Sequence, residues 1–309
     1  MPGQNKMKES TARWFVLFAA VMWGSTGTAQ SFAPEGASPE TIGAMRLLIG
    51  GAVLLIIAAK MGVLKNLRGI PVLATVIAAA SNAAFQFFFF AGVVKTGVAV
   101  GTVITIGSAP VLAGILGFLA RDERPGRRWL AATVLAVLGC GLLFSDGTSL
   151  KINYIGITLA LSAGLSYAVY SVALKQLIER YPPEAVMAVV TCLGAILLSP
   201  ILFTRNLDWL AQPRGWAVVL HLGVVTSAVA YVLFSRALTV LPVATAVTLS
   251  LAEPLTAGML GIIVLGEHLT LFAAIGIGLL LTGLALLLFS SGAVIKDEEP
   301  QGVGRGTRC

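Results

Sequence analysis

Charged residues are scarce in this sequence. Asp, Glu, Lys and Arg together make up 11% of the 309 residues, whereas an ordinary soluble domain has roughly 25%. Hydrophobic residues make up 57% instead. This composition excludes a soluble globular protein. It predicts an all-α integral membrane protein, because apolar runs of about twenty residues cross a bilayer as helices.

Histidine and cysteine, which often bind metals or carry out catalysis, are also rare. The chain has two histidines, and His221 and His268 lack the spacing of metal ligands. Cys140 and Cys192 lie in apolar runs and Cys309 ends the chain, which is the pattern of neither a zinc site nor a disulfide framework. No apolar run contains a convincing Ser/His, paired Asp or His/Glu metal arrangement. We therefore expect no metal, no cofactor and no enzyme activity.

Basic residues outnumber acidic ones, 21 to 14, but none of them form a patch with interleaved aromatic residues. Nucleic acid is therefore not an expected partner. The basic residues lie between apolar runs, sixteen on the side of the N-terminus and four on the other side. The positive-inside rule then predicts that both termini are cytoplasmic. The remaining one, Arg46, falls inside a run about two turns from its outer end, close enough to snorkel or to pair with Glu40 or a carboxylate in a cavity.

Ten apolar runs have the length of a transmembrane helix. They cover residues 13–33, 38–60, 70–93, 96–120, 127–145, 153–177, 182–204, 214–237, 241–265 and 270–290. The basic start and the first run also resemble a signal peptide. That run is long, however, and it completes an internal repeat, so we keep it as a helix of the mature protein.

The sequence contains the same unit twice, at an offset of 144 residues. The segment "SAPVLAGILG" at 108–117 aligns with "AEPLTAGMLG" at 252–261 without a gap, and Pro39 aligns with Pro183. Each unit contains five runs. Because five is odd, the second unit enters the membrane from the opposite side, so the two units are expected to be inverted repeats.

The predicted fold is therefore ten transmembrane helices in two inverted five-helix repeats. The repeats cover residues 13–145 and 153–290, with cytoplasmic tails at 1–12 and 291–309. Inverted repeats allow two similar conformations, each open to one side, with a site near the midplane. They favour a transporter, and duplication followed by drift is the alternative. Glu123 aligns with Glu267, and both are expected at helix ends as solvated caps or gate contacts.

Polar and aromatic residues recur on single helix faces near the centres of the runs. The candidate substrate-binding residues are Trp23, Thr26, Gln30, Asn82, Phe85, Gln86, Tyr167, Tyr170, Ser227, Tyr231 and Glu253. Amides and hydroxyls hydrogen-bond ammonium and carboxylate groups, while aromatic rings supply an apolar wall and cation–π contacts. The alternative is that these polar groups only join neighbouring helices, at about 0.6 kcal/mol each. We favour a cavity for Asn82 with Gln86, because amides that face lipid are costly.

Glu253 lies in the middle of the ninth run, within "SLAEPL". Its counterpart in the first unit is Ala109, although the next residues, Pro110 and Pro254, match. Each proline is expected to kink its helix and to free the carbonyl four residues earlier, at 106 and 250. A carboxylate present in one unit only is not required by a symmetric scaffold. We therefore expect it to hold a substrate ammonium or to carry a proton.

Three further features are short motifs at corresponding places. They are "RLLIGGAVLL" in the second run, the proline-centred fourth and ninth runs, and "LGEHLT" at the end of the ninth run with "ARDERPG" as its weaker counterpart. In these features the chain resembles the EamA-type members of the drug/metabolite transporter superfamily, and most of all the amino-acid exporters of the YddG type. The resemblance implies a secondary carrier of small polar metabolites in a bacterial inner membrane. The essential glutamate that small multidrug-resistance relatives carry in their first helix is missing here.

The leading hypothesis is an alternating-access exporter of amino acids or similar small polar metabolites. The first alternative is proton-coupled efflux of drugs or organic cations, with Glu253 carrying the proton. A channel and an intramembrane enzyme are further alternatives. The exact substrate, the direction in vivo and the oligomeric state are left open by the sequence. The expected partners are a small-molecule substrate and the lipid bilayer.

Overall fold

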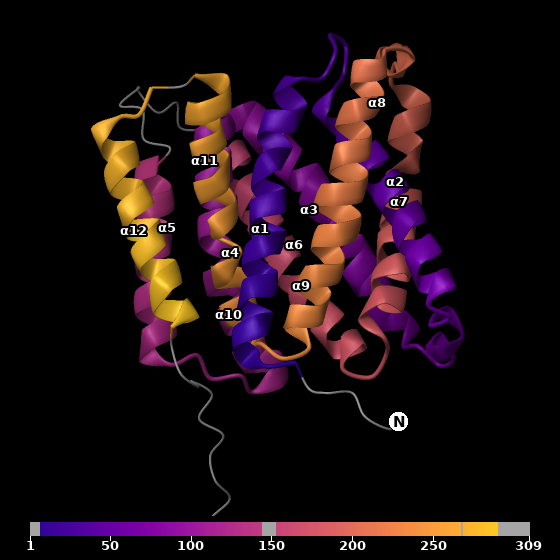
Figure 1. The fold of residues 1–309 in the computed structure, drawn as a ribbon, viewed down its shortest axis with the longest axis horizontal. Coiled ribbons are helices and arrows are strands. Elements are labelled where there is room, and N and C mark those ends of the chain that lie inside the picture. The colour runs from indigo at the N-terminus through magenta and orange to yellow at the C-terminus, as the bar shows by residue number, and fades with distance from the viewer. Residues whose placement is uncertain (1–6, 144–152, 267, 290–309) are drawn as a thin grey trace, which may run out of the picture.

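The computed structural model describes residues 7–143, 153–266 and 268–289, and within them every regular element is a helix. The helices run side by side in one bundle (Figure 1). The first half contains α1 (Glu9–Ser31), α2 (Pro39–Lys60), α3 (Val72–Thr96), α4 (Val98–Arg121), α5 (Arg127–Leu143) and the short 3-10 helix η1 (Leu64–Leu67). The second half contains α6 (Tyr154–Ile178), α7 (Pro183–Thr204), the 3-10 helix η2 (Asp208–Ala211), α8 (Pro213–Leu220), the π-helix η3 (His221–Val229), α9 (Ala230–Leu238), α10 (Val243–Leu249), α11 (Ala252–Leu265) and α12 (Leu271–Leu288).

Eight stretches of the described residues are long and apolar enough to cross a membrane. Six of them are single helices, and two are composite, namely Pro213–Leu238, made of α8, η3 and α9, and Val243–Leu265, made of α10 and α11. The other two predicted runs coincide with α1 and α5. The polar segment "GSTGTAQS" lowers the hydropathy of α1, and α5 has only 17 residues. Both helices lie alongside the eight spans (Figure 1).

The first helix begins at Glu9, earlier than the predicted residue 13. Its first turns are held by Arg13, which pairs with Glu9 at 2.5 Å and donates from Nη1 to the backbone oxygen of Leu288 at 3.0 Å. The start of α1 therefore lies beside the end of α12. Glu267, the predicted C-terminal tail and the predicted repeat ends at 145 and 290 lie outside the described residues.

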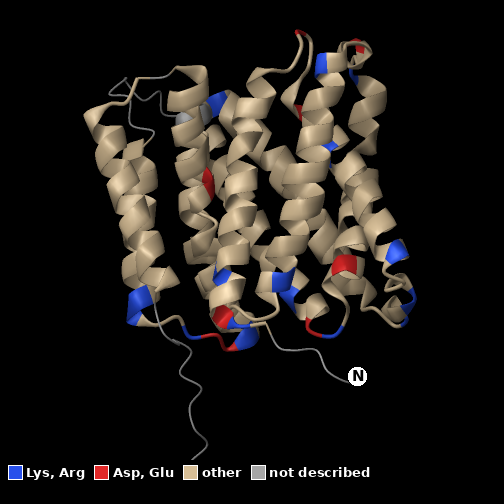
Figure 2. Cartoon of the chain, viewed as in Figure 1, with Lys and Arg blue, Asp and Glu red and all other residues tan. Residues whose placement is uncertain are grey.

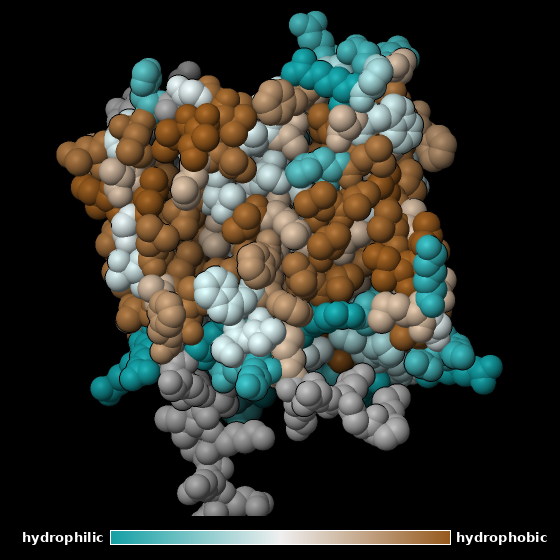
Figure 3. Space-filling view, viewed as in Figure 1, coloured by the Kyte–Doolittle hydropathy of each residue, from teal (hydrophilic) through white to brown (hydrophobic). Residues whose placement is uncertain are grey.

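The exterior of the bundle suits a lipid environment. Hydrophobic side chains form a broad band between hydrophilic ends on the face shown in Figure 3. Leu73, Val94 and Ile263 each expose more than 70% of their surface, which is expected where lipid replaces water. Charged residues gather at the two ends, with more Lys and Arg at the end where the chain begins (Figure 2). We call this the basic end, and the end at which α1 stops the far end.

Glycines allow the closest helix contacts. A Cβ atom on Gly139 of α5 would lie 2.7 Å from the backbone oxygen of Gly276 in α12, and one on Gly276 would lie 2.6 Å from that of Gly139. A Cβ on Gly24 of α1 would lie 2.7 Å from the backbone oxygen of Glu253 in α11. Small residues at such crossings let backbones approach without a hydrophobic driving force. The Gly24 contact also fixes the position of Glu253 relative to α1.

Candidate functional site

The ninth predicted helix is interrupted next to Glu253. α10 ends at Leu249 and α11 begins at Ala252, so that Glu253 lies in the first turn of α11. The carbonyl of Ser250, expected to be free, accepts a hydrogen bond from the backbone N–H of Glu253 at 2.9 Å. That part of the prediction was wrong, because a tight turn at the break satisfies the carbonyl. Pro254 also lies in the first turn, where the missing N–H has no helical acceptor to lose.

A cavity of about 330 Å³ extends from this break toward the far end of the bundle. Every candidate substrate-binding residue except Ser227 lines it, together with Pro254. Pro39, Gln30 and Val93, near the far-end termini of α2, α1 and α3, mark its outer part. The lining also includes Arg46, Thr102, Thr105 and Ser250, which sequence reasoning had left open or passed over. The volume is that of a small-molecule pocket.

Aromatic rings form one wall of the cavity and close its floor. The ring centroids of Phe85 and Tyr167 are 5.7 Å apart, and those of Trp23 and Tyr231 are 6.1 Å apart. Phe234, which is 1% exposed, lies outside the lining and contacts both Trp23 and Tyr167. Trp23 and Tyr167, which align in the repeat, therefore meet through one buried ring.

Trp23 is also held in place by a hydrogen bond to the π-helix. Its Nε1 donates to the backbone oxygen of Thr226 at 2.8 Å, and Thr226 lies within η3. A π-helical turn shifts the backbone hydrogen bonds, and such turns are frequent at functional sites. The bond fixes the indole at the cavity wall and joins α1 to the eighth span.

Two polar groups of the cavity have no protein partner in the described part of the chain. They are the Nδ2 of Asn82 and the Oγ1 of Thr26, and Asn82 is 4% exposed. A buried polar group without a partner costs about 1–3 kcal/mol. By contrast, Thr105 donates to the backbone oxygen of Ala160 at 3.0 Å, so its role is to join two helices.

The described lining of the cavity contains one basic and one acidic side chain. Arg46 donates from Nε to the Oγ of Ser227 at 2.9 Å, and Ser227 is fully buried behind it. Among the described residues, no ion pair within 4.0 Å joins Arg46 to Glu253 or to Glu40. The predicted pairing with Glu40 is therefore absent from that part of the chain.

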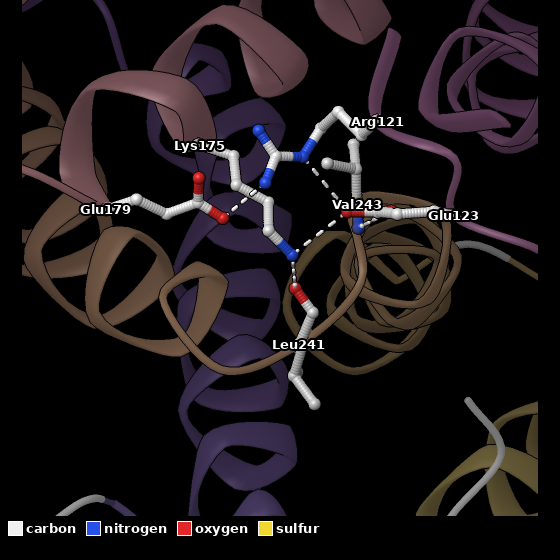
Figure 4. A network of polar contacts seen from close by, with 6 residues as sticks. All are labelled: Arg121, Glu123, Lys175, Glu179, Leu241 and Val243. Carbon is white, nitrogen blue, oxygen red and sulfur yellow. Dashed lines mark hydrogen bonds and ion pairs between the residues drawn. The ribbon is translucent and has the colours of Figure 1, made fainter. Parts of the chain in front are cut away.

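An ion network ties helix ends together at the basic end of the bundle (Figure 4). The Nζ of Lys175 donates to the backbone oxygen of Leu241 at 2.6 Å and pairs with Glu123 at 3.0 Å. Glu123 also pairs with Arg121 at 3.2 Å and accepts from the backbone N–H of Val243 at 2.8 Å. Arg121 in turn pairs with Glu179. Glu123 is thus no solvated cap, because it binds three elements and its side chain is only 14% exposed.

Two buried leucines lie between the cavity lining and this network along their helices. Leu174 lies between Tyr170 of the lining and Lys175 of the network, and Leu238 lies between Tyr231 and Leu241. None of the described residues of the network lines the cavity.

Known proteins with similar sequences are membrane transporters. The sequence profile of the EamA-like transporter family matches residues 11–145 and again residues 154–289. An uncharacterized transporter, YwfM of Bacillus subtilis, is 45% identical over 91% of this chain and 95% of its own length. A probable terminal-alkyne amino-acid exporter of Streptantibioticus cattleyicolor is 26% identical over 91% of this chain and 94% of its own.

Two more relatives add a partial match and a fold. The threonine/homoserine exporter RhtA of Salmonella typhimurium is 37% identical over 44% of this chain and 46% of its own length. A solved crystal structure has a TM-score of 0.79 at 21% identity, covering 90% of this chain and 96% of its own, and it shows the fold alone. The protein is therefore a multi-pass transporter of the bacterial inner membrane and not an enzyme. The chain belongs to the EamA-like transporter family of the drug/metabolite transporter superfamily.

Proposed function

We propose that the protein exports amino acids or similar small polar metabolites by alternating access. The observation that carries the proposal is the cavity, in which the amide residues Asn82 and Gln86, two charges of opposite sign and several aromatic rings surround a space that reaches the far end of the bundle. Such a lining fits a small zwitterion better than an apolar solute. Two of the relatives are named as amino-acid exporters, which supports the same substrate class.

We also propose the ten-span, inverted-repeat arrangement, with repeats at 13–145 and 153–290 and both termini in the cytoplasm. Its support is that α1 and α5 lie alongside the eight apolar spans and that basic residues gather where α1 begins. Equivalent pairs of spans also pack together, α1 against α11 and α6 against α4. In this orientation the cavity faces the periplasm and the ion network closes the cytoplasmic side.

In the proposed cycle, the ion network is a gate that opens when the cavity closes toward the periplasm. Glu123 joins the end of the fourth span to Lys175 of α6 and to the first N–H of α10. A rocking motion of the two halves would separate these elements together. The contacts are polar and few, so they can be broken and remade without dismantling the apolar core.

The test is counterflow of radiolabelled threonine in proteoliposomes of the purified protein. Wild type is expected to accumulate label when unlabelled threonine is inside, and Asn82→Ala to slow this uptake at least about tenfold, because the amide is a binding group in a desolvated site. Thr158→Ala is the matched control, since Thr158 is an exposed helix residue that bonds only its own helix. If liposomes with wild-type protein exchange none of the twenty amino acids, the proposal is wrong.

Proton-coupled efflux of organic cations is the second candidate, favoured by the carboxylate of Glu253 at the inner end of the cavity. Arg46 in the same cavity argues against it, because a fixed positive charge repels a cationic substrate. Ethidium transport that depends on a pH gradient and is lost in Glu253→Gln would favour this candidate instead.

A further inference from the structure

We infer that the cavity holds a zwitterion in one orientation, with the carboxylate of the substrate on Arg46 and its ammonium on Glu253. The inference rests on the proposed function and goes beyond it by assigning the two charged ends of the substrate. It also makes Arg46 a specificity residue. Three observations carry it: the geometry of Arg46, the geometry of Glu253, and the separation of the two.

Arg46 is oriented by Ser227 and keeps donors for a ligand. A guanidinium has five N–H donors, and the described contacts use only the Nε of Arg46, which donates to Ser227 at 2.9 Å. One helical turn further along α2, a Cβ on Gly50 would lie 2.6 Å from the Cβ of Ser227. Gly50 therefore lets η3 approach α2 closely enough to place the serine hydroxyl beside the arginine. The remaining fork of N–H groups matches the geometry of a carboxylate.

Glu253 is a matching acceptor. Its carboxylate lines the cavity and receives no hydrogen bond from the described residues. The carboxylate belongs to the first turn of α11, whose backbone is fixed against Gly24 of α1. A carboxylate on a rigid backbone at a cavity wall is suited to receive an ammonium group.

The two charges share one cavity but do not pair with each other. Both residues line the cavity, and among the described residues no ion pair within 4.0 Å joins them. An unpaired charge within a membrane protein is costly. An α-amino acid carries both complementary charges and compensates both residues at once. A simple amine compensates only the charge of Glu253 and leaves Arg46 without a counter-charge. A simple carboxylic acid compensates only the charge of Arg46 and leaves Glu253 without one.

The test is competition of threonine, threoninamide and N-acetylthreonine against counterflow of labelled threonine. The amide has lost the carboxylate and the N-acetyl compound has lost the ammonium. For wild type, both derivatives are expected to compete at least about tenfold more weakly than threonine, because each leaves one desolvated charge without its partner.

The variants separate the two ends of the substrate. Arg46→Gln is expected to abolish the preference for threonine over threoninamide and to keep the preference for threonine over N-acetylthreonine. Glu253→Gln is expected to keep the first preference and to abolish the second. Arg46→Lys and Glu253→Asp should restore each preference in part. Ser227→Ala keeps the charge of Arg46 but not its orientation, so a weaker preference over the amide is expected even if Arg46→Gln does not fold.

The possible failures are distinguishable. If wild type does not exchange threonine or any other amino acid, the proposed function fails and this inference with it. If wild type exchanges threonine while Arg46→Gln and Ser227→Ala both keep the full preference over threoninamide, the proposed function stands and the orientation is overturned.

Discussion

The two halves of the molecule place an aligned proline in very different helices. α4 runs without interruption through Pro110, whereas the corresponding stretch is divided into α10 and α11 just before Pro254. The interruption lies at Ser250 and Leu251, whose counterparts at 106 and 107 are helical. The proline therefore does not by itself break a helix here. At the break, Ser250 donates from Oγ to the backbone oxygen of Val247 at 2.7 Å, a bond that Ile106 cannot make.

Both stretches nevertheless line the same cavity. The first half contributes Ile106 and Ala109, and the second contributes Ser250 and Glu253. At these aligned positions, the first half supplies two apolar side chains, and the second half supplies a hydroxyl and a carboxylate next to the N-terminus of α11. Under the proposed function, this difference is expected if the ligand needs an acid on one side only.

The largest expected effect comes from making the second half resemble the first. Glu253→Ala is expected to lower threonine counterflow at least about tenfold, because an ammonium in the cavity would lose its counter-charge. Ala109→Ser, at the equivalent position of α4, should lower counterflow less than Glu253→Ala does, because it removes no charge from the cavity. The rates are measured in proteoliposomes at equal protein content.

Moving the acid tests whether its position matters. The double variant Glu253→Ala with Ala109→Glu is expected to remain inactive, because residue 109 lies inside the continuous helix α4 and not in the first turn of α11. Recovery of counterflow by this double variant would show that any carboxylate in the cavity suffices.

A second effect concerns the gate, which draws Glu123 from the first half and Lys175 from the second. Removing one member of a buried ion pair destabilises the closed arrangement by about 3–5 kcal/mol, and both side chains here are less than 15% exposed. Glu123→Ala is therefore expected to open the cytoplasmic end. Glu179→Gln should have less effect, because its side chain is 41% exposed and exposed pairs contribute little.

The readout for the gate is the labelling of a cysteine placed at Val247, near the inner end of the cavity, in a chain whose native cysteines are replaced. A membrane-impermeant thiol reagent on the cytoplasmic side is expected to label this cysteine several times faster in Glu123→Ala, since the population of open gates rises. Equal labelling rates with and without Glu123 would remove the network from the gating proposal.

Local patterns in the sequence anticipated much of the bundle. Apolar runs predicted where the helices lie, and the i, i+4 spacing of Asn82 and Gln86 predicted that both face the same cavity. These features depend on residues within one helix, for which periodicity is informative. Glu253 was accessible for another reason, because an acid in the middle of an apolar run whose counterpart is Ala109 indicated a functional group.

Features that depend on distant contacts were not accessible. The bond between Arg46 and Ser227 joins residues 181 positions apart, and no local pattern indicates which distant hydroxyl orients the guanidinium. Lys175 lies in an apolar helix but reaches Glu123 and the carbonyl of Leu241 through tertiary packing. The break at Ser250 depends on hydrogen bonds of a tight turn, whereas a proline rule predicts only a kink.

A third effect tests a place where the halves are alike. A Cβ on Gly139 would lie 2.7 Å from the backbone oxygen of Gly276, and one on Gly283 would lie 2.7 Å from that of Ala132. Gly139→Ala and Gly283→Ala are therefore expected to lower the unfolding temperature by similar amounts, since overpacking typically costs about 1–3 kcal/mol. Gly141→Ala is the control, because its Cβ meets nothing within 4 Å. Clearly unequal losses would show that α5 and α12 do not contact each other equivalently.

The smallest effect is expected at the two aligned prolines, Pro110 and Pro254, where the residue is the same in both halves and only the backbone differs. Pro254 lies in the first turn of α11, where an added N–H finds no helical acceptor, so Pro254→Ala should change threonine counterflow by less than about twofold. Pro110 lies inside α4, and Pro110→Ala restores an N–H that can bond the carbonyl of Ile106 and straighten the helix. Since Ile106 lines the cavity, Pro110→Ala should alter the KM for threonine more than Pro254→Ala does. If Pro254→Ala altered the KM more than Pro110→Ala, the break before Glu253 would depend on Pro254. The turn at Ser250 would then not explain why α4 is continuous and the α10–α11 stretch is divided.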